Sequence, residues 1–126
     1  MSAEVRIVLT TAPDPDTARE LARGLVEERL AACCNLLGNV TSVYRWEGRV
    51  EQAAEVLLVV KTAAARLPEL QAALLARHPY AVPELVVLAP EELEPRYLAW
   101  LLEATAPGRP AAAPTDPPRP DPGREG

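Results

Sequence analysis

The chain has 126 residues, a formal net charge of −5, two cysteines and one histidine. This length has room for one domain, and an acidic domain without a basic stripe is a poor partner for phosphate backbones, so we expect no nucleic-acid partner. The longest apolar runs, Val56–Val60 and Leu85–Ala89, are too short to span a bilayer, so we expect no membrane partner.

Composition divides the chain into a folded part, residues 1–106, and a Pro-rich tail, residues 107–126. The tail has no Leu, Ile, Val, Met or aromatic residue, so we expect it to be disordered. The first residues show no charged leader followed by an apolar stretch, which predicts no secretory signal. Cys33 and Cys34 are adjacent and rarely form an unstrained disulfide in that position. Reduced thiols favour a cytoplasmic localisation.

The first elements are a strand and a helix. Val5–Thr11 is short and rich in β-branched residues, which predicts a strand. Asp14 followed by Pro15 is typical of a helix N-cap and first helical position. From Ala18 to Leu30 apolar residues recur at three- and four-residue steps, which predicts an amphipathic helix with one buried face.

A long hairpin should follow the first helix. Residues 32–47 resemble one long strand with an irregularity at Gly38-Asn39, and Glu47-Gly48 predicts a tight turn. The chain then returns as a second long strand from Val50 to Lys61.

The last elements are a helix, a strand and a short helix. Leucines from Leu67 to Leu75 mark the second helix, which His78-Pro79 should end, because the residue before proline is pushed out of the α region. Glu84–Leu88 predicts the last strand, and Glu94-Pro95 opens a short C-terminal helix. This order predicts an α+β fold, the ferredoxin-like split βαβ with a long central hairpin, in which a sheet is covered by helices.

Three strands are apolar on both of their faces. Ile7–Leu9, Val56–Val60 and Leu85–Leu88 lack the alternation expected of a sheet with one face in water. Exposing one face would forgo about 10–20 kcal/mol, which is comparable to the net stability of a domain. We therefore expect identical subunits to cover this face in a closed oligomer. The alternative is that the C-terminal helix folds across it.

Several residues could carry chemistry, and each has a plainer interpretation. His78 could bind a metal, because imidazole suits copper and zinc, or it could be a helix-end or core residue. Tyr44 and Trp46, near the hairpin tip, could anchor an interface or pack into a core. Lys61 and Glu84 could meet on neighbouring strands or be solvated strand ends.

The sequence carries no recognisable catalytic apparatus. Ser2 and Ser42 are the only serines and neither lies in a nucleophile elbow. There is no Walker loop, no dinucleotide fingerprint and no Cys-x-x-Cys or zinc-finger spacing. We expect the protein not to be an enzyme.

Six blocks of sequence resemble the CutA divalent-cation-tolerance family over about residues 4–103. They are Thr11-Ala12-Pro13-Asp14, Glu28-Arg29-Leu30-Ala31-Ala32-Cys33, Ser42-Val43-Tyr44-Arg45-Trp46-Glu47-Gly48, Val56-Leu57-Leu58-Val59-Val60-Lys61-Thr62, His78-Pro79-Tyr80 with Val82-Pro83-Glu84, and Tyr97-Leu98-Ala99-Trp100. The resemblance implies a ferredoxin-like homotrimer with inward-facing sheets, linked to tolerance of divalent metals, copper especially.

The resemblance also implies a copper(II) site with a Cys ahead of the Thr-Ala-Pro-Asp block and two histidines before Pro-Tyr. This chain has Thr10 in place of the Cys and Arg77 in place of the first histidine. Only His78 carries over as a metal residue, so the resemblance implies that copper(II) or another divalent cation is bound weakly.

Two other functions remain open at this point. One is a small-molecule-sensing trimeric regulator of the PII or ACT kind, which shares the subunit fold but signals through a long loop where this chain has Glu47-Gly48. The other is an enzyme with a cleft between subunits that uses Lys61, His78, Tyr80 and Glu84.

Overall fold

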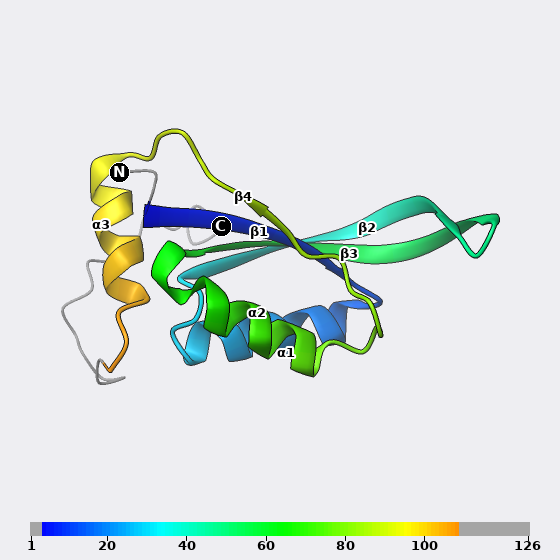
Figure 1. Ribbon diagram of the computed structural model, residues 1–126, viewed down its shortest axis with the longest axis horizontal. Helices are drawn as coiled ribbons and strands as arrows, with labels where there is room; N and C mark the ends of the chain where they lie inside the picture. The colour runs from blue at the N-terminus through cyan, green and yellow to red at the C-terminus, as the bar shows by residue number, and fades with distance from the viewer. Residues whose placement is uncertain (1–3, 109–126) are drawn as a thin grey trace, which may run out of the picture.

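The computed structural model describes residues 4–108. Its elements run in the order β1 (Val5–Ala12), α1 (Pro15–Glu27), β2 (Cys33–Trp46), β3 (Arg49–Ala63), the 3-10 turn η2 (Ala64–Arg66), α2 (Leu67–Arg77), β4 (Val86–Leu88) and α3 (Pro95–Ala104). Helices α1 and α2 lie side by side on one face of the sheet (Figure 1). The predicted α+β, ferredoxin-like arrangement is confirmed. The tail is expected to be disordered, and its residues from 109 on lie outside the described residues.

The four strands form one sheet in the order β2-β3-β1-β4. Every neighbouring pair is antiparallel, and the register pairs Val8 with Val60 on β3 and with Val87 on β4. The first strand of the chain is therefore central. This topology separates β3 from β4, so the sequence-based idea that Lys61 and Glu84 meet on neighbouring strands is wrong for a single subunit.

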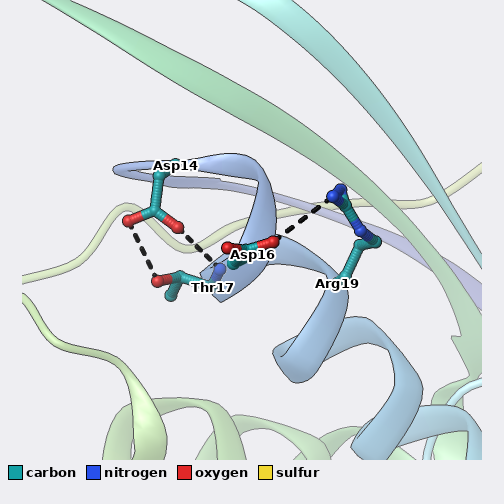
Figure 2. A network of polar contacts seen from close by, with 4 residues as sticks. All are labelled: Asp14, Asp16, Thr17 and Arg19. Carbon is teal, nitrogen blue, oxygen red and sulfur yellow. Dashed lines mark hydrogen bonds and ion pairs between the residues drawn. The ribbon is translucent and has the colours of Figure 1, made fainter.

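Helix α1 begins where the sequence predicts. Asp14 is the N-cap, and its carboxylate accepts hydrogen bonds from the backbone N–H and the hydroxyl of Thr17, at 2.7 Å and 3.2 Å (Figure 2). Within the first turn Asp16 also pairs with Arg19 at 3.3 Å. The bond from the Thr17 N–H satisfies a first-turn donor that has no partner inside the helix, and the cap therefore fixes where α1 begins.

The core lies between the two helices and the sheet. Alternate side chains of the strands point into it, among them Val8, Leu58 and Val60, which are fully buried against Leu25 of α1 and Leu74 of α2. The intervening side chains point away from the helices. They form what we call the open face, which consists of Ile7, Leu9, Cys33, Asn35, Leu37, Leu57, Val59, Lys61, Val86 and Leu88.

Strands β2 and β3 extend well beyond the helix layer (Figure 1). Pairing of β1 with β3 ends at Ala12 and Val56, so residues 40–55 form a two-stranded hairpin arm. Its register shifts between Leu37 and Val40, as the sequence predicts for Gly38-Asn39. Glu47 and Gly48 both have positive φ, 51° and 81°, which is the two-residue turn that matches the twist of a hairpin.

Helix α3 lies at the end of the sheet farthest from the hairpin tip (Figure 1). It packs through Leu101 against Val5 and Ala32, which form a second small core at the first residues of β1 and just before β2. The alternative in which α3 crosses the open face is therefore wrong. In the part of the chain that the structure describes, no helix has the length and apolar character needed to cross a membrane.

Candidate functional site

Candidate functional residues gather where β1 ends and the hairpin arm begins. His78 follows α2 directly, and its side chain is buried, with 7% of the residue exposed. Its Nε2 lies 2.7 Å from the carbonyl oxygen of Thr11, and the backbone N–H of Tyr80 donates to its Nδ1 at 3.0 Å. Both ring nitrogens are therefore engaged with backbone groups.

Tyr80 connects this segment to the hairpin arm. Its ring centroid is 4.8 Å from that of His78, and its hydroxyl donates to Oε2 of Glu55 at 2.7 Å. The hydroxyl of Ser42 donates to Oε1 of the same carboxylate at 2.6 Å. Each carboxylate oxygen of Glu55 thus accepts a hydrogen bond from a hydroxyl, one in the loop after α2 and one on β2. We call Thr11, His78, Tyr80, Glu55 and Ser42 the polar chain.

The surroundings of Tyr80 favour its neutral form. Burial, the hydrogen bond to Glu55 and the negative charge of that carboxylate raise the pKa of Tyr80 to about 12. Tyr44 and Asp14 lie near enough to add smaller contributions in the same direction. The phenol therefore stays protonated and donates its hydrogen bond throughout the neutral range.

The other expected cleft residues do not join this group. Lys61 lies on the open face between Ile7 of β1 and Cys33 of β2. Glu84 is exposed and precedes β4, which is shorter than predicted and begins at Val86. Lys61 is level with Leu88 through Ile7, two strand spacings or roughly 10 Å across the sheet, and Glu84 precedes Leu88 by a further four residues. Of the four predicted cleft or metal residues, the structure brings only His78 and Tyr80 together.

Tyr44 and Trp46 lie on the outer half of the hairpin arm. They are 45% and 54% exposed, and Val43 and Val50 on the same arm are 63% and 66% exposed. The interpretation of Trp46 as a core residue does not fit this position in one subunit. An apolar arm that projects from the body is a surface of the kind that protein interfaces cover.

The cysteines have different environments. Cys34 points into the core, and burial, followed by the effect of Cys33, raises the pKa of its thiol to about 12. Cys33 lies on the open face, 3.8 Å from the side-chain oxygen of Asn35. Both thiols are free. As neighbouring residues of one strand, the two cysteines lie on opposite faces of the sheet.

The residues present do not fit a dedicated copper site. Within residues 4–108 no three His, Cys, Asp or Glu side chains cluster as metal ligands would. Thr10 is fully buried and its hydroxyl has no hydrogen-bond partner there, but a neutral hydroxyl is a poor substitute for the thiolate or imidazole that copper prefers. Arg77 forms an ion pair with Glu28 at 2.7 Å, so it is engaged elsewhere.

Sequence reasoning missed Glu55 and Ser42. Glu55 opens an apolar run and Ser42 sits in an alternating strand, so each resembles an ordinary polar residue of a hairpin. The signal for them was Tyr80 itself, since a half-buried tyrosine hydroxyl usually has a partner. The partner could not be named without the fold.

The fold and these contacts define a class of protein: a ferredoxin-like α+β domain with one open, largely apolar sheet face and a projecting hairpin arm. Comparison with known proteins identifies the family. Residues 6–104 match the family described as CutA1 divalent ion tolerance protein. The chain belongs to this family.

Individual relatives agree with that assignment. The divalent-cation tolerance protein CutA of Thermus thermophilus is 48% identical over 99 residues, which is 79% of this chain and 96% of the relative. The solved structure of the Cut A1 protein from the same organism superposes with a TM-score of 0.79 at 47% identity and covers 81% of this chain and 99% of that one. The structure of CutA from Xylella fastidiosa has a TM-score of 0.80 at 36% identity, covering 82% and 99%.

Proposed function

We propose that the protein acts as a homotrimer in tolerance to divalent cations, without enzymatic activity and with only weak binding of copper(II) or another divalent cation. Family membership supports the link to divalent cations. The trimer follows from the resemblance to the family together with the open face. We also propose that it works in the cytoplasm, which the two free thiols favour.

The proposal of an oligomer rests on the apolar character of the open face. Leu37, Val86 and Leu88 remain 48%, 43% and 46% exposed in one subunit. Because full burial of such a side chain is worth about 1.5–3 kcal/mol, covering the remaining half of each would contribute roughly 1 kcal/mol. The exposed side chains of the hairpin arm add a similar amount each. A second and third copy of the chain would cover these surfaces.

The side chains of the described residues are compatible with weak metal binding. The domain is acidic, which attracts cations in general, but no ligand cluster is present in residues 4–108. The sensing alternative finds no support in the hairpin, because the connection between β2 and β3 is two residues long. It offers no flexible loop that could act as an output.

Light scattering with a metal titration tests this function. We expect a mass near three times the 13.6 kDa of one chain, and binding of copper(II) only at high micromolar concentration or above, by titration calorimetry. Cells that lack the protein should grow less well in excess copper(II) and recover with the wild-type chain. A monomer of 13.6 kDa, or growth that does not depend on the protein at any metal concentration, would contradict the proposal.

A further inference from the structure

The hydrogen bonds of His78 define which of its nitrogens carries the proton. A carbonyl oxygen can only accept, so the 2.7 Å contact with Thr11 requires a proton on Nε2. A backbone N–H can only donate, so the 3.0 Å contact with Tyr80 requires a lone pair on Nδ1. The neutral imidazole satisfies both contacts in one tautomer.

This tautomer leaves His78 no lone pair for a metal. Copper and zinc bind imidazole through a nitrogen lone pair, and the one on Nδ1 already accepts from Tyr80. A cation there would displace the Tyr80 N–H and leave a partly buried donor without a partner, which is unfavourable. Within residues 4–108 His78 belongs to no cluster of three or more His, Cys, Asp or Glu side chains that would offset that loss.

The same two bonds fix the path of the chain after α2. Pro79, between His78 and Tyr80, has no N–H and a restricted φ, so this short segment has few alternatives once the imidazole is held. The bond to Thr11 ties the imidazole to the end of β1, 67 residues away in sequence. The bond from Tyr80 then directs its side chain toward Glu55.

Glu55 is the first residue of β3 beyond the end of β1 pairing, so it marks the start of the hairpin arm. Past this point the arm has no third strand beside it, and the Tyr80 hydroxyl gives it a hydrogen bond to the segment that follows α2. Ser42 attaches the same carboxylate to the other strand of the arm. The polar chain therefore runs from β1 through the loop after α2 to both strands of the arm.

We infer that His78 is a positioning residue in this chain and not a metal ligand: it holds Tyr80 so that the tyrosine hydroxyl secures Glu55 and, with it, the direction of the hairpin arm. This role concerns the subunit itself. It does not depend on the proposed trimer or on the proposed tolerance to divalent cations.

Nitrogen NMR of the imidazole tests the inference directly, because the chain has a single histidine and its ring signals are unambiguous. Full-length wild-type protein labelled with ¹⁵N should show a protonated Nε2 and an unprotonated Nδ1. Addition of Zn²⁺ to tenfold excess should leave both nitrogen shifts unchanged. The opposite tautomer, or a ring nitrogen that shifts with Zn²⁺, would overturn the inference.

Variants at the same position separate positioning from general stability. His78→Asn keeps a side-chain acceptor close to the place of Nδ1, whereas His78→Ala has none. We expect exchange of the Tyr80 amide hydrogen to be about tenfold faster in His78→Ala and close to wild type in His78→Asn. Equal exchange in wild type and His78→Ala would refute the positioning role, and failure of His78→Ala to fold leaves the wild-type spectrum as the deciding measurement.

Discussion

Replacing Leu88 by glutamate tests the proposal that further copies of the chain cover the open face. Leu88 lies on edge strand β4, opposite Ile7, with its side chain on the open face and half in water. A glutamate there costs a single subunit little, because its carboxylate can remain hydrated. In an assembly whose subunits cover this face, the same carboxylate would lose its water.

The size of the effect follows from these two environments. Each subunit loses roughly 1 kcal/mol of apolar burial at position 88. Each also pays several kcal/mol to desolvate an unpaired charge. Three subunits together lose on the order of 10 kcal/mol, and since about 1.4 kcal/mol is a factor of ten, the assembly constant should fall by about 10⁷.

Light scattering after gel filtration measures this change, with circular dichroism to show that the variant is folded. Wild type should elute near three times 13.6 kDa and Leu88→Glu near 13.6 kDa. Leu75→Glu is the matched control, because Leu75 is 52% exposed but lies on α2, away from the open face. The reasoning is refuted if folded Leu88→Glu keeps the wild-type mass, or if Leu75→Glu dissociates equally.

Three further predictions follow from particular contacts. Asp14→Ala should lower Tm by a few degrees and Asp14→Asn by much less, because asparagine keeps a side-chain acceptor for the Thr17 N–H. Since the Thr17 bonds hold the pKa of Asp14 below its usual value, the difference between wild type and Asp14→Ala should shrink as acid protonates the carboxylate, as thermal melts across pH can show. Thr10→Val should raise stability by about 1 kcal/mol in urea unfolding, because it removes a buried hydroxyl without a partner; a loss would mean that the hydroxyl is satisfied. Burial and Glu55 raise the pKa of Tyr80 from 10.0 to about 12, so the stability that the protonated phenol contributes is complete below pH 10 and is lost as pH rises through 12. Between pH 10 and 12 Tyr80→Phe should therefore lose less stability than wild type. An identical pH dependence of the two proteins would contradict this expectation.

Local sequence signals were sufficient for most of the fold. Asp14-Pro15 and the spacing of Ala18 to Leu25 predicted α1 because capping and amphipathicity act within a few residues. Glu47-Gly48 predicted the turn for the same reason. Strand β4 was predicted too long, since Glu84 and Leu85 suit a strand but β1 pairs with β4 only at residues 7–9.

The candidate site depended on contacts that no local pattern encodes. His78 was singled out as the only histidine, yet its partner Thr11 lies 67 residues away, and Tyr80 finds Glu55 at a separation of 25. The chemistry of a histidine depends on whether its lone pair is already in use. That is decided by the packing of β1 against the loop after α2, which sequence alone does not give.

The central place of β1 has a consequence for how the chain folds during synthesis. The amino-terminal strand emerges first from the ribosome, but both of its neighbours, β3 and β4, are made later, and Val8 must wait for Val87. Contacts between residues so far apart in sequence form slowly, because a long loop must close before they contribute any stability. The nascent chain must therefore keep β1 unpaired until β3 has been translated, and the second neighbour of β1 is complete only at Leu88.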